Sequence, residues 1–184
     1  DPCFPTTRVP AGKGHIRIFW QGSVTHEADI KMLQKTIKRL DDRFMMVMAG
    51  YTQQVEWERM AGYFTDHERM TYVILPGAPP DEYYRNYQYA DIAVVPLLST
   101  KFNGYKSNLK ILEAAHMGIP VLASNVHPYK GMDGVLYVNR AEDWYEHLHR
   151  PADELAEAAK TLQAYCDKHY NFDEINERRK AIFL

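Results

Sequence analysis

The chain of 184 residues holds only two cysteines, Cys3 and Cys166, which are far apart and in no metal-binding or redox spacing. They therefore do not predict a disulfide framework. A run of about 18 apolar residues is absent, so we expect no membrane span. No signal peptide is visible, and we expect a cytoplasmic location. The net charge of −2 lacks the basic excess of nucleic-acid-binding domains, so we expect no nucleic-acid partner.

Sequence motifs of several common active sites are also missing. No G-x-G-x-x-G follows the first predicted strand and there is no Walker A lysine signature, which disfavours dinucleotide dehydrogenases and P-loop NTPases. No G-x-S-x-G elbow or Cys/His arrangement predicts a hydrolase. The histidines show no convincing ligand spacing, and His147-x-His149 alone is a weak signal. We therefore expect neither a metal site nor a cofactor.

What the chain does have is a regular alternation of apolar runs and amphipathic segments, within an ordinary globular composition of 46% hydrophobic and 25% charged residues. Residues 1–14 are rich in Pro, Gly and Thr and predict a linker or extended arm. Apolar runs predict strands at His15–Trp20, Phe44–Ala49, Thr71–Leu75, Ile92–Val95, Ile119–Ala123 and Val135–Val138. Helical patterns predict helices at Thr25–Leu40, Gln53–Phe64, Pro79–Tyr89 and Ala141–His149, one that starts at Pro151, and one from Asn171 to about Phe183.

Strands that alternate with helices and are almost continuously apolar predict a parallel sheet covered on both faces. We therefore expect an α/β fold, a Rossmann-like doubly wound parallel sheet of about six strands, over residues 15–170, with a C-terminal helix in residues 171–184. In the strand order 3-2-1-4-5-6 the order reverses between the first and fourth strands, and ligands bind at that switch point. The loops that leave those two strands are Gln21–Thr25 and Pro96–Asn108.

The stretch Asp91–Ser124 carries charge in an unusual place. Lys106 and Lys110 lie in the first turns of a predicted helix, with Lys101 just upstream, although a helix N-terminus is itself positive. Acidic residues are usual there. Each exposed lysine at such a site costs about 0.3–1 kcal/mol, and a bound anion such as phosphate removes that cost. Charge and topology therefore indicate the same loop as an anion-binding site.

The turn Gly22-Ser23 opens the helix that follows the first predicted strand. Backbone amides in a glycine turn can cradle a phosphate, but many turns between a strand and a helix contain glycine, so an ordinary turn is the alternative. His26 follows the turn. It either donates to a diphosphate or is an incidental loop histidine.

Glu113 lies on the same predicted helix face as Lys106 and Lys110, at steps of three and four residues. A carboxylate one to two turns into the helix can accept two hydrogen bonds from vicinal ribose hydroxyls. Two alternatives stay open: a solvated or salt-bridged Glu113, and a Lys110–Glu113 surface pair worth about 0.2–0.5 kcal/mol.

Two stretches, YADIAVVPL and KSNLKILEAAHMGIPVLAS, resemble the nucleotide-sugar-binding C-terminal domain of retaining glycosyltransferases with the GT-B fold, of the kind that share an E-x7-E motif. FWQGS matches the first strand and diphosphate loop of that family less specifically. The resemblance covers most of residues 15–140 and is specific over residues 91–124. It implies one half of a GT-B fold and retaining, metal-independent transfer of a sugar from a nucleoside diphosphate-sugar to an unknown acceptor.

The resemblance also assigns roles to residues. The matched positions are Gly22 and Ser23 in the diphosphate loop, Lys106, Ser107 and Asn108 at the donor loop and helix start, Glu113 at the ribose, and Leu75 and Pro76 at the backbone edge that meets the base. Lys106 would stabilise the charge that develops on the leaving diphosphate. Tyr105 stands where the first glutamate of the motif, which contacts the donor sugar, is expected.

The resemblance further implies a partner, an N-terminal acceptor-binding domain of the same protein, toward which the helix over residues 171–184 packs. Because the chain begins at Asp1 without a methionine, we expect it to be processed or trimmed, with a neighbouring domain missing. The isolated chain should then bind donor and turn it over poorly or not at all. The main alternative is a non-catalytic glycosyltransferase-like binding module, which Tyr105 favours. A small signalling domain would need acidic residues where Gln21-Gly22 and Pro76-Gly77 stand.

Overall fold

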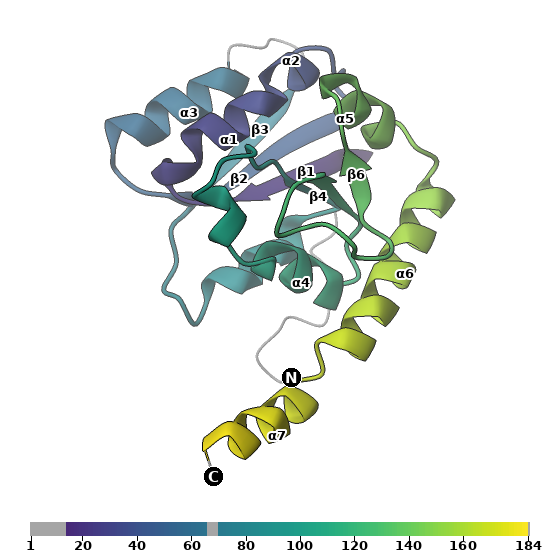
Figure 1. Cartoon of the computed structure of the whole chain (residues 1–184). Coiled ribbons are helices and arrows are strands. Elements are labelled where there is room, and N and C mark those ends of the chain that lie inside the picture. Colours follow the sequence, from purple (N-terminus) through teal and green to yellow (C-terminus); the bar gives the residue numbers. More distant parts are fainter. Residues whose placement is uncertain (1–13, 66–69, 184) are drawn as a thin grey trace.

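Six parallel strands form one sheet in the order β3-β2-β1-β4-β5-β6 (Figure 1). The structure, a computed structural model, describes residues 14–65 and 70–183; apart from Gly14, the predicted arm over residues 1–14 lies outside them. The strands are β1 (Ile16–Gln21), β2 (Phe44–Tyr51), β3 (Thr71–Pro76), β4 (Ile92–Val95), β5 (Val121–Ser124) and β6 (Leu136–Val138). The predicted doubly wound fold is confirmed, and the observed strand order is the one on which the predicted switch point depends.

The order reverses between β1 and β4, whose pairing places Ile18 opposite Ile92. On the other side β1 pairs with β2 along its whole length, from Ile16 opposite Phe44 to Gln21 opposite Ala49. Because every strand runs in the same direction, the carboxyl ends of β1, β2 and β4 meet at one edge of the sheet. The loops that follow these strands are therefore neighbours.

Helices cover both faces of the sheet, which explains why its strands are apolar on both sides. The α-helices are α1 (Glu27–Ile30), α2 (Gln34–Ile37), α3 (Val55–Thr65), α4 (Leu109–His116), α5 (Ala141–Leu148), α6 (Ala152–His169) and α7 (Phe172–Phe183). Helices α1, α2, α3 and α5 pack with Ile18 and Trp20 of β1. Helices α4 and α6 pack on the opposite face with Phe19.

The predicted helix over Thr25–Leu40 is divided into short pieces. The 3-10 helices η2 (Val24–His26) and η3 (Lys31–Leu33) alternate with α1 and α2. The predicted apolar stripe is nevertheless buried, since Ile30, Leu33, Ile37 and Leu40 are at most 3% exposed. The stripe positions share a face at steps of three and four residues, a spacing that both helix types satisfy.

The start of α4 also differs from its prediction. The segment after β4 makes a 3-10 turn, η5 (Asn103–Tyr105), and Lys106 is extended, with φ −73° and ψ 160°. The helix begins only at Leu109, after Asn108 at the N-cap position. Lys106 therefore precedes the helix, and Lys110 is the lysine in its first turn.

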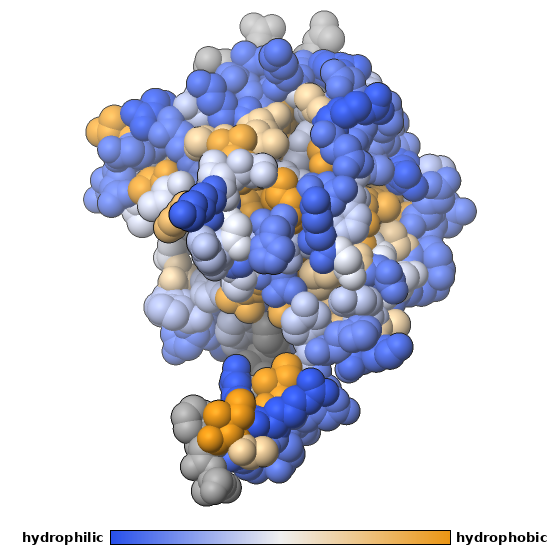
Figure 2. All heavy atoms as spheres, in the orientation of Figure 1, coloured by the Kyte–Doolittle hydropathy of each residue, from blue (hydrophilic) through white to orange (hydrophobic). Residues whose placement is uncertain are grey.

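The C-terminal helix α7 projects beyond the body of the domain from the end of α6 (Figure 1). Apolar side chains are exposed on it in the surface view (Figure 2), and Ile182 is 77% exposed. Among the helices of the described residues, none is both long and apolar enough to cross a membrane.

Candidate functional site

A cavity of about 550 Å³ opens at the carboxyl ends of β1, β2 and β3. Its walls come from the loop after β1, the ends of β2 and β3, the 3-10 helix η4 (Tyr83–Tyr89), and the start of α4. The loops that follow β1 and β4 both contribute, so the cavity lies at the switch point of the sheet. Its volume falls in the range typical of small-molecule sites.

Glycine backbone forms one side of this cavity, at Gly22, Gly50 and Gly77. The amide of Gly22 donates to the carbonyl of Ala49 (3.1 Å), and that of Gly77 donates to the carbonyl of Tyr51 (2.7 Å). Gly50 has a φ of +108°, and a Cβ placed on it would lie 2.2 Å from the carbonyl oxygen of Gly22. Side chains are thus excluded where these loops approach, and backbone faces the cavity.

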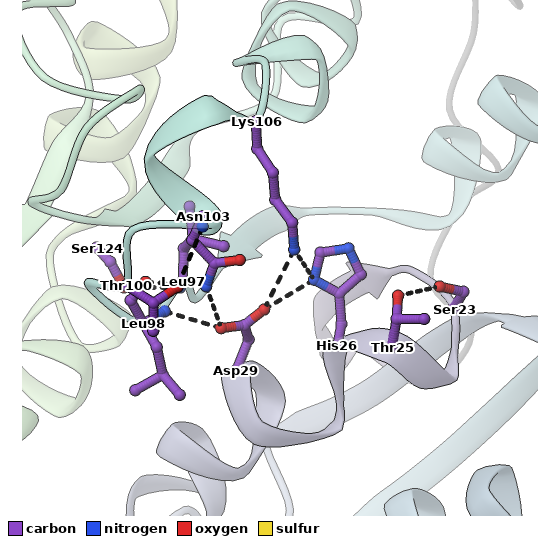
Figure 3. A network of polar contacts seen from close by, with 10 residues as sticks. All are labelled: Ser23, Thr25, His26, Asp29, Leu97, Leu98, Thr100, Asn103, Lys106 and Ser124. Atoms are coloured by element: carbon purple, nitrogen blue, oxygen red, sulfur yellow. Dashed lines mark hydrogen bonds and ion pairs between the residues drawn. The ribbon is translucent and has the colours of Figure 1, made fainter.

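Asp29 of α1 joins the two loops of the switch point (Figure 3). It is 3% exposed. Its Oδ1 accepts hydrogen bonds from the amide of Leu98 (2.8 Å) and from Nδ2 of Asn103 (3.2 Å), both in the loop after β4. Its Oδ2 contacts Nδ1 of His26 (2.9 Å) and Nζ of Lys106 (3.8 Å). Burial raises the pKa of Asp29, but these hydrogen bonds outweigh it and hold the pKa below its usual value.

Lys110 reaches the glycine turn from the other side. Its Nζ lies 5.6 Å from the centre of the Trp20 ring and 3.3 Å from where a Cβ on Gly22 would stand. Burial lowers the pKa of Lys110 to about 8, and the charge on Lys106 adds to this effect. The alternative Lys110–Glu113 ion pair is not among those formed by the described residues. Lys110 is therefore a desolvated amine directed at the turn, where an anion would stabilise its charged form.

Glu113, in the second turn of α4, is buried at 6% exposure. The hydroxyl of Tyr83 donates to its Oε1. The nearby hydroxyl of Tyr87 donates to the carbonyl of Lys110 (3.2 Å). Burial raises the pKa of Glu113, and the hydrogen bond from Tyr83 opposes that rise.

Unpaired polar atoms gather at the cavity. Within the described parts of the chain, four buried side-chain polar atoms lack a hydrogen-bond partner, and those of Gln21, Asn86 and Glu113 belong to cavity residues. They are Oε1 of Gln21, Nδ2 of Asn86 and Oε2 of Glu113. Each unsatisfied group costs about 1–3 kcal/mol. A ligand that both donates and accepts hydrogen bonds would remove this cost.

Comparison with known proteins identifies the family. Residues 15–162 match the family described as glycosyl transferases, group 1. The chain is a group 1 glycosyl transferase domain. No curated protein matches it.

Solved structures share the Rossmann-like, GT-B fold of this glycosyl transferase domain. Alr3699/HepE from Anabaena, in complex with UDP and glucose, superimposes with a TM-score of 0.69 at 12% identity, over 92% of this chain and 48% of its own. The UDP-forming α,α-trehalose-phosphate synthase from Burkholderia xenovorans has a TM-score of 0.61 at 14% identity, over 85% of this chain and 41% of its own. At these identities the likeness concerns the fold.

A third structure is the catalytic domain of the cholesterol-α-glucosyltransferase from Helicobacter pylori. It has a TM-score of 0.61 at 12% identity, and the match covers 85% of this chain and 98% of that domain. The group 1 domain described here thus spans less than half the length of the first two structures and nearly all of the third.

The fold brings together one part of the residue set expected from the sequence. Gly22, Ser23, Lys106, Ser107 and Glu113 all line the cavity. These five residues come from two segments more than 80 positions apart, which the parallel pairing of β1 and β4 makes adjacent.

The other expected residues stand outside the cavity lining. Tyr105 is 83% exposed. Asn108 donates to the hydroxyl of Tyr170 (2.7 Å). Leu75 packs against a core cluster, and Pro76, the last residue of β3, does not line the cavity either, so that Gly77 and Ala78 are the ones that reach it.

Several residues that line the cavity have no ligand-binding role predicted from the sequence. Tyr83 and Asn86 lie on η4, where the predicted helix gave no reason to expect a ligand. Gln21 opens the predicted loop after the first strand, but no ligand role is predicted for its side chain. Lys110 stands out in the sequence as a lysine in the first turns of the predicted helix, but a surface ion pair with Glu113 is an equally open interpretation and no donor-binding role is assigned to it. Its signal was the missing acidic residue in the first turn of α4.

Proposed function

We propose that this group 1 domain is the donor-binding half of a glycosyltransferase, of the hexosyltransferase class, that transfers a sugar from a nucleoside diphosphate-sugar to an acceptor. The observation that carries the proposal is the pairing of charges in one cavity. A desolvated lysine, Lys110, lies at the glycine turn, and a buried carboxylate with an unused oxygen, Glu113, lies one turn further along the same helix. A nucleoside diphosphate presents an anion and two vicinal hydroxyls and therefore suits both.

The diphosphate would lie against Gly22, Ser23 and Lys110, with Lys106 and Ser107 beside it. Backbone amides and lysines supply the positive charge that stabilises a leaving diphosphate. This role needs no metal ion, so we propose metal-independent transfer. Lys106 keeps its proposed catalytic role, but its Asp29 neighbour compensates part of its charge in the empty cavity. Lys110 therefore joins it as a second catalytic candidate.

The nucleoside would extend toward Glu113 and η4. The free Oε2 of Glu113 can accept hydrogen bonds from both ribose hydroxyls while Tyr83 holds Oε1. The base would then reach the backbone of Gly77 and Ala78, in line with the base edge expected just before them at Leu75 and Pro76. The complex of Alr3699/HepE with UDP and glucose supports a nucleoside diphosphate as the occupant.

The acceptor and the stereochemistry rest on the family resemblance. We propose transfer with retention and an N-terminal acceptor-binding domain as partner. The chain matches less than half of two of its neighbours, and α7 exposes apolar Ile182, both of which support a missing partner surface. A cytoplasmic location stays a prediction from the sequence.

A non-catalytic binding module is the second candidate. Tyr105 favours it, because the family pattern has a sugar-contacting glutamate at this position and the tyrosine is exposed outside the cavity. The two candidates differ in one measurement. Hydrolysis of a nucleotide sugar by the full-length protein supports the enzyme, and binding without any turnover supports the module.

Calorimetric titration of UDP and GDP into the domain tests the site. Charge-assisted hydrogen bonds contribute about 1.5–3 kcal/mol, so we expect Lys110→Ala and Glu113→Gln each to raise the Kd of the nucleotide that binds by about 10- to 150-fold. Lys101→Ala is the matched control, since Lys101 is an exposed lysine of the loop before α4 and lies outside the cavity lining. Unchanged affinity in both site variants would overturn the assignment.

A further inference from the structure

His26 occupies the diphosphate end of the cavity without an obvious role. Its ring contacts Asp29 and Lys106, and the centre of the Trp20 ring lies 6.5 Å away in a T-shaped arrangement. Nδ1 is 2.9 Å from Oδ2 of Asp29 and 3.4 Å from Nζ of Lys106. A lysine ammonium and the N–H of an imidazole both act only as hydrogen-bond donors. The shorter contact, to a carboxylate, therefore places the ring proton on Nδ1.

This tautomer leaves Nε2 as a lone-pair acceptor in the neutral ring. Figure 3 shows that nitrogen turned away from Asp29. No protein donor from the described part of the chain is hydrogen-bonded to it. His26 lines the cavity, so Nε2 is the nitrogen available to a ligand.

Three charged groups face the ring from three segments. Asp29 comes from α1, Lys106 from the segment before α4, and Lys110 from α4 itself. The hydrogen bond to Asp29 raises the pKa of His26, but burial and the two lysines outweigh it and lower the pKa below its usual value. His26 is therefore mainly neutral at pH 7 in the empty cavity. A bound diphosphate reverses this balance, because it offsets the lysines and because its oxygens repel the Nε2 lone pair.

We propose that His26 takes up a proton from solvent when the donor diphosphate binds, so that Nε2–H donates to a diphosphate oxygen and Asp29 serves as the counter-ion of the imidazolium. This inference rests on the proposed function. The imidazolium of His26 would then be a cation that forms at the diphosphate only when the diphosphate is bound. Asp29 makes this possible, since its carboxylate offsets the charge of an imidazolium that would otherwise stand beside two lysines.

Proton uptake on binding tests the proposal directly. UDP-glucose is the first probe because it has no terminal phosphate. A terminal phosphate, with a second pKa of about 6, would itself exchange protons on binding and confuse the measured uptake. Binding enthalpies are measured at pH 7.0 in PIPES and in ACES, whose ionisation enthalpies differ, and the difference gives the protons taken up per site. GDP-mannose is titrated in the same way.

His26 should dominate the uptake at this pH. A histidine with a pKa below 6.5 is less than about one quarter protonated at pH 7, so full protonation takes up more than about three quarters of a proton. Lys110, with a pKa of about 8, is already about nine-tenths protonated and can add only about 0.1. We expect His26→Gln to reduce the uptake to about that remainder and to weaken binding. His26→Lys, which carries a fixed charge, should keep the affinity and lose the uptake.

The outcomes separate the two proposals. Uptake above about half a proton in the wild-type domain that falls to about 0.1 in both variants supports the role of His26. Tight binding with equal uptake in wild type and His26→Gln overturns that role and leaves the donor site intact. Failure of both nucleotide sugars to bind the folded wild-type domain overturns the proposed function itself.

Discussion

Glu113 should lower the stability of the empty domain while it strengthens nucleotide binding, and the variant Glu113→Gln separates the two effects. The carboxylate is 6% exposed, and one of its oxygens has no hydrogen-bond partner among the described residues. A buried unsatisfied acceptor costs about 1–3 kcal/mol, and more when it is charged. Glutamine keeps an oxygen for the Tyr83 hydroxyl and removes the charge. We therefore expect the variant to stabilise the ligand-free domain by about 1 kcal/mol.

For a domain of this size that gain corresponds to a rise in Tm of about 2–4 °C. The pH dependence follows from the raised pKa of Glu113, which means that the folded state binds its proton more readily than the unfolded state. The cost of the carboxylate is therefore fully present above the folded pKa and is relieved as the pH falls through it. The advantage of the variant should accordingly shrink in acid.

Thermal or urea unfolding at pH 7 and at pH 5, together with titration of UDP, measures both effects on the same samples. Glu58→Gln is the control, because Glu58 is exposed on α3. We expect the site variant to gain stability and lose nucleotide affinity, and the control to change in neither. A variant that is less stable than wild type, with unchanged affinity, would refute the assignment of Glu113 as a ligand carboxylate.

Three further predictions concern the anion-binding side. The pKa of Lys110 is about 8 in the folded state and 10.5 in the unfolded state, so the unfolded state binds more protons between these values and stability should rise with pH there. Nucleotide affinity should fall over the same pH range in wild type and fall less in Lys110→Arg. A flat affinity profile from pH 7 to pH 9.5 would contradict this. Asp29→Asn should destabilise the domain by about 1–3 kcal/mol in urea unfolding, because it weakens three contacts with the loop after β4 and one with His26, and an unchanged midpoint would contradict it. Gly50→Ala should destabilise by about 1–3 kcal/mol or more and abolish UDP binding, because its Cβ meets the Gly22 carbonyl at a positive φ; Gly62→Ala, a helical glycine with open space around it, should instead gain up to about 1 kcal/mol.

The sheet was predictable from the sequence because its determinants are local. Short apolar runs separated by helical patterns leave few alternatives to a doubly wound parallel sheet, and the observed strand order matches. The switch point follows from that order. The glycine turn, Lys106 and Glu113 were therefore expected to meet before their distances were known.

The boundaries of α4 were harder to predict. Lys106 and Lys110 are four residues apart, and their spacing alone suits one helix face. The 3-10 turn at Asn103–Tyr105 and the extended Lys106 move the helix start to Leu109. The positive field of a helix N-terminus therefore acts on Lys110, in the first turn of α4, and Lys106 precedes the helix.

Asp29 was not predictable, because its importance lies in contacts with residues 69 and 74 positions away. In the sequence it is an acidic residue near a helix start, where acidic residues are common. Nor does the sequence show which side of a strand end reaches a cavity. At the end of β3, Leu75 packs against the core and Gly77 faces the cavity.

A structure of the domain with UDP-glucose bound tests the central claim most directly. The account predicts diphosphate oxygens within about 3 Å of Nζ of Lys110 and of the Gly22-Ser23 turn, and ribose hydroxyls within the same distance of Oε2 of Glu113. A nucleotide bound elsewhere, or one in this cavity that leaves both side chains without a contact, would contradict it.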